Sequence, residues 1–220
     1  AAFFFCYSLR QITIPSSMTS IGESAFSHCS SLAQITIPSS MTSIEKYTFV
    51  RCNSLTQIIL PSSVTSIGES AFDNCNSLTQ IIIPSSVTSI GNNPFTNCPN
   101  LAQIDIESAN KHYVFIEGVL FTKDVQSIIC CLVNKAGSYN IPSSVTSIGN
   151  KAFSHCSSLT EITIPSSVTS IGDYAFSSCS SLTQVTIPSS VTYIGNKAFS
   201  HCSSLTEITI PSSVTSIGDY

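Results

Sequence analysis

A single period dominates this sequence: proline, cysteine and phenylalanine each recur at the same constant interval, with one interruption. The prolines stand at Pro15, Pro38, Pro61 and Pro84, and again at Pro142, Pro165, Pro188 and Pro211, so that each step within a group is 23 positions. A fixed period of this length is the sequence signature of a stack of repeated coils. One coil cannot bury its own apolar residues, so successive coils must stack to form a continuous core. The chain is therefore predicted to fold as a solenoid.

Each repeat divides into three short sides. Residues 32–37 end in an alternation of apolar and polar residues, which is typical of a half-buried strand. Pro38 ends this strand because proline has no N–H for a hydrogen-bond ladder. A second alternation over residues 64–67 predicts another brief strand, and we expect Gly68 to supply a turn with positive φ. Apolar residues at roughly three-residue steps over 71–78 predict a single 3₁₀ or helical turn.

The first side of the repeat is predicted to form the principal sheet, on the concave face of a right-handed, β-rich solenoid. The expected strands are parallel because each coil adds the same segment in the same direction. Their centres are predicted at Ile12, Ile35, Ile58, Ile81, Ile104, Tyr139, Ile162, Val185 and Ile208.

Charge and hydropathy exclude two classes of partner. Only 9% of residues are charged and the net charge is −4, so the chain lacks the basic surface that nucleic-acid binding requires. The longest apolar runs, residues 1–7 and 128–133, are far too short to span a bilayer. The first run also lacks the charged segment and cleavage site of a signal peptide. We therefore expect neither nucleic-acid binding nor membrane insertion in this chain.

The residues of the repeat also carry a family resemblance. The pattern CxxLxxIxIPxxVxxIGxxAFxxC runs from Cys156 through Pro165 and Gly172 to Cys179. It resembles the BspA-type leucine-rich repeat, and the resemblance covers essentially the entire chain. That class is associated with cell-surface proteins of certain bacteria and of parasitic protists. The resemblance implies a leucine-rich-repeat solenoid, a cell-surface or extracellular location, and a role in adhesion or interaction with host or other proteins.

The regular repeat is interrupted once, between residues 107 and 141. We divide the chain into regular repeats over 1–106, an irregular longer repeat over 107–141 and regular repeats over 142–220 of one continuous solenoid. The β-prone runs 114–121 and 126–133 predict a hairpin within the irregular part. This segment is either a longer coil that bulges from the stack or a dedicated binding insert. Neither end resembles a capping unit, so we expect a fragment of a longer array.

The residues of this sequence that most resemble a catalytic site are the cysteines that follow a histidine. A histidine precedes Cys29, Cys156 and Cys202, but a Cys–His nucleophile needs the imidazole within hydrogen-bond reach of the thiol. The cysteine column is predicted to point inward and the histidines outward, so we expect no catalytic residues and no enzyme. Only Cys130 and Cys131 are close in sequence, and no CxxC pair exists, so we expect no metal and no cofactor.

The stacked cysteines are predicted to stay reduced. Parallel strands lie about 4.7–4.9 Å apart, and the cysteine Cβ atoms of successive coils should keep that spacing. A disulfide needs Cβ atoms about 3.8 Å apart. We therefore expect buried thiols that act as small apolar side chains.

The exposed side of the principal strands is where a ligand would bind. Most coils place Gln or Glu beside Thr on this side, but the pattern breaks in the middle of the chain. The candidate binding residues there are Gln57, Ile59, Gln80, Ile82, Gln103 and Asp105. Contiguous exposed apolar residues often mark interaction sites. The alternative is that β-branched residues fill these positions because they favour strands.

Two functions follow as hypotheses. The first is a non-enzymatic binding scaffold, adhesive at a cell surface, that takes a protein or glycan ligand on its concave sheet. The second is a structural module that self-assembles, because the last coil leaves Ile208, Ile210 and Ile217 without a successor to cover them. On that second hypothesis we expect a homodimer formed through the solenoid ends.

Overall fold

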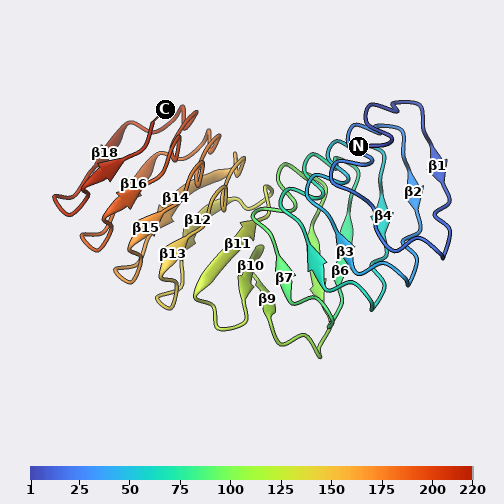
Figure 1. Ribbon diagram of the computed structural model, residues 1–220. Helices are drawn as coiled ribbons and strands as arrows, with labels where there is room; N and C mark the ends of the chain where they lie inside the picture. The colour runs from blue at the N-terminus through green and yellow to red at the C-terminus, as the bar shows by residue number, and fades with distance from the viewer. Residues whose placement is uncertain (220) are drawn as a thin grey trace. The chain divides into compact units, whose positions relative to one another are not determined.

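The computed structural model describes residues 1–219, which form two compact units, Ala1–Phe115 and a second beginning at Ile116 (Figure 1). Each unit is a stack of coils built from short strands and turns, which recur with the period of the sequence. No helix is present in 1–219. The fold class predicted from the repeat, a leucine-rich-repeat β-solenoid, is confirmed.

All nine predicted principal strands are present. In the first unit they are β1 (Gln11–Ile12), β2 (Gln34–Ile35), β4 (Gln57–Ile58), β6 (Gln80–Ile83) and β8 (Gln103–Ile106). In the second unit they are β12 (Gly137–Asn140), β14 (Leu159–Thr163), β16 (Gln184–Thr186) and β18 (Glu207–Thr209). Every pairing among them is parallel, and equivalent positions of successive coils lie opposite each other in the regular part, as Gln11 does to Gln34.

The prediction of one continuous principal sheet is wrong. The nine strands form three hydrogen-bonded groups, β1-β2, β4-β6-β8 and β12-β14-β16-β18. Only the isolated bridge between Thr36 and Ile59 connects the first group with the second. The third group begins after residues 107–136, which do not follow the regular repeat.

The second side of each coil contributes another set of strands. These are β3 (Ser43–Ile44), β5 (Ser66–Ile67) and β7 (Ser89–Ile90) in the first unit, and β13 (Ser147–Ile148), β15 (Ser170–Ile171), β17 (Tyr193–Ile194) and β19 (Ser216–Ile217) in the second. Three further strands, β9 (Tyr113–Ile116), β10 (Val119–Thr122) and β11 (Ser127–Cys131), belong to the same sheet as β13, β15, β17 and β19. β10 and β11 pair antiparallel, with Val119 opposite Cys131, and β11 then pairs parallel with β13.

The third side of each coil is a run of turns that stands where single 3₁₀ or helical turns were expected. Cys75 N–H donates to Phe72 O at 3.2 Å, the i to i+3 pattern of such a turn. Ser70 and Asn74, however, have φ values of 50° and 58°, and a left-handed residue stops a right-handed helix from continuing. The N–H groups of Ser70, Phe72 and Asn74 donate instead to carbonyls of the following coil.

Stacked phenylalanines and buried thiols fill the core. In the first unit the rings of Phe26, Phe49, Phe72 and Phe95 follow one another at centroid distances of 5.5–5.7 Å, with interplanar angles of 6–15°. Beside them the thiol of Cys75 donates to Phe49 O at 3.1 Å, and that of Cys98 donates to Phe72 O at 3.1 Å. The buried cysteine side chains therefore also satisfy carbonyls of the preceding coil.

Gly68 does not supply a positive φ, so that prediction is wrong. A Cβ added at Gly68 would lie 2.5 Å from the backbone nitrogen of Lys46 in the preceding coil. Glycine is required here because the backbones of successive coils approach closely. Glu45 holds the corresponding position one coil earlier, directly after β3, and β3 is the first strand of its sheet. A side chain at this position, that of Glu45, is therefore found where the sheet β3-β5-β7 begins.

One side chain covers the free edge of β7. The hydroxyl of Tyr113 accepts a hydrogen bond from the Ile90 N–H at 2.8 Å and donates to Thr88 O at 3.3 Å. Asn110 holds this corner, because its amide donates to Pro84 O and its side-chain oxygen accepts from the Tyr113 N–H at 3.0 Å. The phenol thus replaces the backbone partners that another coil would supply at this edge.

Replacing Tyr113 with phenylalanine should destabilise the first unit by about 1–3 kcal/mol, because it leaves the buried Ile90 N–H without an acceptor. Chemical denaturation measures the loss, and hydrogen exchange of the Ile90 amide should become faster. Tyr193→Phe is the matched control, since Tyr193 is 40% exposed. Equal stability of both variants would show that the phenol does not close the edge.

The thiols provide a second test of the fold. All ten cysteines are free and eight are buried, whereas Cys6 and Cys202 are only partly buried. Burial raises the pKa of Cys29 to about 11 and that of Cys98 to about 12. We therefore expect an alkylating reagent to label at most Cys6 and Cys202 in the folded chain and all ten after denaturation, as counted by mass spectrometry.

The same shifts set the sign of a pH dependence. An unfolded thiol loses its proton near its usual pKa of about 8.5, whereas the buried thiols keep theirs. The free energy of unfolding should therefore fall as the pH rises above roughly 8.5, as measured by denaturation at several pH values. A rise over that range would contradict the burial of the column.

Candidate binding face

The six candidate residues lie together in the first unit, on the sheet β4-β6-β8. Gln57, Gln80 and Gln103 are opposite one another across the three strands. Ile82 pairs with Asp105 in the same way, and Ile59 directly follows β4. We call these six residues, Gln57, Ile59, Gln80, Ile82, Gln103 and Asp105, the principal face.

Alternation along the strands decides which side chains this face presents. Ile58, Ile81 and Ile104 are at most 3% exposed and belong to the core. Their neighbours must point to the opposite side of the sheet, because successive side chains of a strand alternate. Ile59 is accordingly 71% exposed and Ile82 is 49% exposed. Two isoleucines on adjacent strands therefore form an apolar patch that faces solvent.

The polar end of the principal face is held by hydrogen bonds. The Gln80 amide donates to Asp105 Oδ2 at 2.7 Å, and the Gln103 amide donates to Asp105 Oδ1 at 3.2 Å. Both donors are neutral amides, so they bring no positive charge to this end of the face. Among the described residues, 1–219, no salt bridge to Asp105 is seen.

A hollow adjoins the apolar end of the face. It has a volume of about 290 Å³ and lies between β2 and β4, where only the Thr36–Ile59 bridge joins the strands. Its lining includes Gln34, Thr36 and Thr56 together with Gln57, Ile59 and Pro61. The principal face is therefore bordered on one side by a depression with a mixed polar and apolar lining and on the other by a hydrogen-bonded carboxylate.

The principal strands of the second unit present a different chemistry. Thr163, Thr186 and Thr209 occupy the positions that Ile59, Ile82 and Asp105 hold in the first unit, and all three threonines are exposed. A larger hollow of about 490 Å³ lies over β16 and β18, lined by residues such as Thr183, Gln184 and Glu207. This hollow offers hydroxyl, amide and carboxylate groups, and the isoleucine in its lining, Ile187, is buried.

The His28–Cys29 pair is not arranged as a base and a nucleophile. The Cys29 thiol donates to Phe3 O at 3.2 Å, whereas His28 Nδ1 lies 2.9 Å from the hydroxyl of Ser27. Burial also raises the pKa of Cys29 to about 11, the opposite of what an activated thiol needs. No group of three or more histidine, cysteine, aspartate or glutamate side chains within 1–219 could hold a metal ion.

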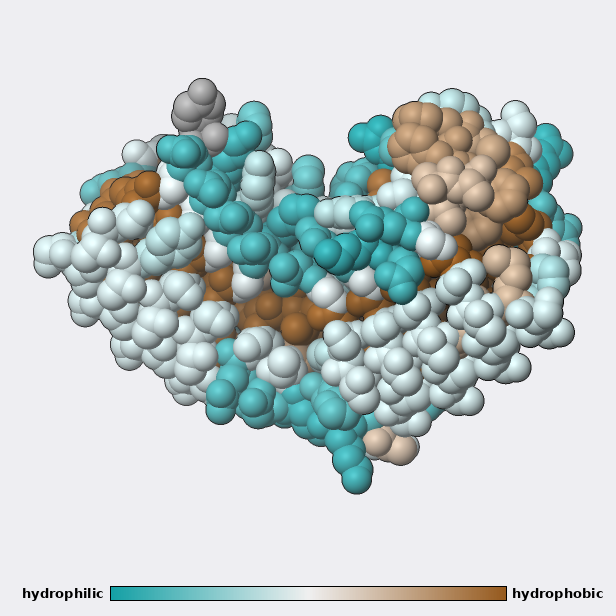
Figure 2. All heavy atoms as spheres, viewed as in Figure 1, coloured by the Kyte–Doolittle hydropathy of each residue, from teal (hydrophilic) through white to brown (hydrophobic). Residues whose placement is uncertain are grey.

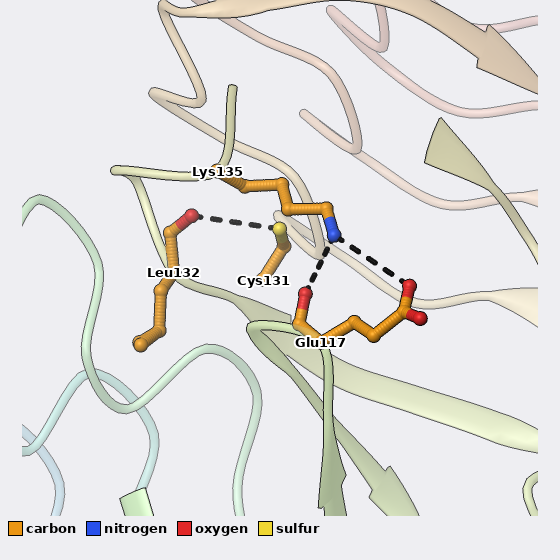
Figure 3. Close-up of polar contacts among 4 residues, drawn as sticks. All are labelled: Glu117, Cys131, Leu132 and Lys135. Carbon is orange, nitrogen blue, oxygen red and sulfur yellow. Dashed lines mark hydrogen bonds and ion pairs between the residues drawn. The ribbon is translucent and has the colours of Figure 1, made fainter. Parts of the chain in front are cut away.

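A polar cluster that sequence reasoning missed holds the irregular segment. Lys135 donates to Glu117 O at 2.7 Å and lies 3.9 Å from the Glu117 carboxylate (Figure 3). Its ammonium nitrogen also lies 4.5 Å from the centre of the Tyr139 ring. Cys131 lies beside Lys135 and donates to Leu132 O at 3.5 Å. Lys135 therefore ties the turn before β10 to the segment before β12, and the charge content of residues 107–141 was its only sequence signal.

Two further surface properties are relevant to partners. Phe3, Phe4, Phe5 and Tyr7 are 38–55% exposed, and Figure 2 shows a hydrophobic patch near the N-terminus. Among residues 1–219 no helix is long and apolar enough to cross a membrane.

Comparison with known proteins identifies the repeat. The model of the BspA type leucine rich repeat region matches residues 1–122 and 130–220, with six copies. No curated protein sequence matches the chain. The structure of the pneumococcal vaccine antigen PcpA is similar over 95% of this chain and 58% of that protein, with 27% identity and a TM-score of 0.79. The chain thus spans little more than half the length of that antigen.

Two other solved structures are similar. A leucine rich cell surface protein from Faecalibacterium prausnitzii is 31% identical, with a TM-score of 0.75, over all of this chain and 75% of that one. A leucine-rich repeat protein from Eubacterium ventriosum is 24% identical, with a TM-score of 0.69, over 96% of this chain and 81% of that one. The last similarity bears on the fold alone.

Proposed function

The chain belongs to the BspA-type leucine-rich repeat family, and from that premise we propose that it is an adhesive scaffold that binds a protein at a cell surface through the principal face. Proteins of this family are generally non-enzymatic scaffolds. The single observation behind the proposal is the pair Ile59 and Ile82, which are exposed on adjacent strands where the second unit has threonine.

The energetics favour a protein ligand over a glycan at this face. Fully burying an isoleucine side chain contributes about 1.5–3 kcal/mol, and a protein surface with apolar side chains would gain it from both residues. A glycan offers mainly hydroxyl groups, which match the threonine-rich surface of the second unit better. Asp105 and the glutamines then form the polar rim that surrounds the buried centre of most protein interfaces.

A cell-surface location is supported by the similar proteins. One of them is described as a leucine rich cell surface protein and another as a vaccine antigen. The adhesive role is proposed from the combination of such a location with the exposed pair Ile59 and Ile82, because contiguous exposed apolar residues often mark interaction sites.

The test is a binding screen followed by two substitutions. The whole chain of 220 residues is first screened on arrays of extracellular proteins and of glycans. The affinity of the strongest protein ligand is then measured for the unmodified chain and for the Ile59→Thr/Ile82→Thr variant. We expect weaker binding, because the substitutions remove the apolar patch. Stability should change by no more than about 0.5 kcal/mol per substitution, since both side chains face solvent.

Thr186→Ser in the second unit is the control and should leave affinity unchanged. Unchanged affinity of the double variant would overturn the proposed site. Hits confined to the glycan array would overturn the proposed protein ligand.

Self-association is a second candidate, and the exposed aromatic side chains of the first coil favour it. Phe4, Phe5 and Tyr7 are 43–55% exposed, at positions where the next coil has Ser27, His28 and Ser30. Light scattering of the whole chain should show a mass that rises with concentration, and Phe5→Lys should abolish the rise because it places a charge in the contact. A constant monomer mass would contradict this candidate.

A further inference from the structure

We infer that the principal face selects an amphipathic helix that presents two apolar side chains to Ile59 and Ile82 and an arginine or lysine to Asp105. This inference rests on the proposed function and adds the chemistry and conformation of the partner. It draws on the order of the side chains, on their spacing and on the charge of Asp105.

The order of side chains across the strands is polar, apolar, apolar, acidic. Thr36 bridges to Ile59, and the register of β4, β6 and β8 then places Ile59 beside Ile82 and Ile82 beside Asp105. Neighbouring strands lie about 4.8 Å apart. A partner that lies across the strands therefore meets two apolar groups and then a carboxylate, each about one strand spacing from the last.

This spacing fits a helix better than an extended segment. Side chains at positions i and i+3 or i+4 of a helix have Cβ atoms about 5–6 Å apart, close to the step between strands. Seven helical residues rise about 10.5 Å, and two strand steps from Ile59 to Asp105 cover about 9.6 Å. Same-side residues of an extended segment are roughly 6.7 Å apart and lose register after one step. The favoured partner sequence is apolar-x-x-x-apolar-x-x-basic.

The carboxylate of Asp105 is prepared for a cation. Hydrogen bonds from Gln80 and Gln103 fix both of its oxygens, so a partner does not have to order this side chain on binding. Neither amide neutralises the charge, and no cation of 1–219 forms an ion pair with Asp105. Glu107 is exposed two residues further along and accepts a hydrogen bond from the Ser85 N–H at 2.7 Å. Both charges at this end of the face are therefore negative.

The second unit lacks this combination. Its threonines at the equivalent positions provide no apolar patch, and its carboxylates, Glu161 and Glu207, stand in the column that Gln80 and Gln103 occupy in the first unit rather than beside an isoleucine. The inferred partner should consequently bind the first unit alone, which supplies an internal comparison within the same chain.

The experiment uses three labelled peptides of about 18 residues, a length chosen so that isolated helix formation is feasible. All share an alanine–glutamine background with Leu-x-x-x-Leu, and the residue three positions later is arginine, glutamine or glutamate. Binding to the whole chain is measured by fluorescence anisotropy. We expect the arginine peptide to bind most tightly and the glutamate peptide most weakly, and added salt to weaken the arginine peptide most.

Asp105→Asn should lower the affinity for the arginine peptide by about two- to five-fold, the range of an exposed ion pair, and leave the glutamine peptide unchanged. Asp173→Asn removes the same charge from the second unit and is the matched control. Asn occupies the corresponding position at Asn150 and Asn196, so this variant keeps its local fold. An equal loss with both variants would show attraction by net charge alone and overturn the inference.

The double variant Ile59→Thr/Ile82→Thr separates the inference from the proposed function. If all three peptides bind equally and the double variant weakens them all, the inference fails while the proposed face stands. If binding is unaffected by the double variant and by Asp105→Asn, both fail. Absence of binding by every peptide overturns the inferred helix, and the protein array then decides the proposed function alone.

Discussion

The hydrogen bonds between successive coils set the geometry of everything else in this protein. Because each coil repeats the last at a constant interval, the ladders place identical positions directly above one another. Any side chain that points outward therefore becomes part of a column with a spacing of about 4.8 Å. A binding face can consequently be changed in one coil without altering the coils that support it.

Successive coils are joined in a different way on each of the three sides of the coil. The principal strands pair through ordinary parallel hydrogen bonds, and the second strands are followed by a glycine position at which a Cβ would meet the backbone of the preceding coil. The turns present N–H groups to the next coil from residues such as Ser70 and Asn74, which adopt left-handed conformations. Short side chains add to the same pattern, as when Ser63 Oγ donates to Met41 O at 2.6 Å.

The two units use this scaffold differently. Residues 149–174 recur letter for letter as 195–220, so the outward columns of the second unit alternate regularly between two coils. In the first unit one outward column is glutamine in every coil, whereas the other begins with threonine and changes to Ile59, Ile82 and Asp105. Specific recognition is therefore better supported in the first unit, where the outward residues of some coils depart from the repeated pattern.

The sequence by itself determined the repeat, the parallel strands and the burial of Phe, Cys and Leu, because a fixed period leaves the stacking of coils as the only way to cover them. It also determined that Ile59 and Ile82 point outward, since they alternate with core residues. Only the tertiary structure decided where the ladders end, because this depends on contacts between coils: Glu45 at a glycine position and Tyr113 over Ile90 are ordinary residues in the sequence. The hydrogen bond from Gln80 to Asp105 was likewise decided by the tertiary structure. The two residues are 25 positions apart and meet only through the register of β6 and β8.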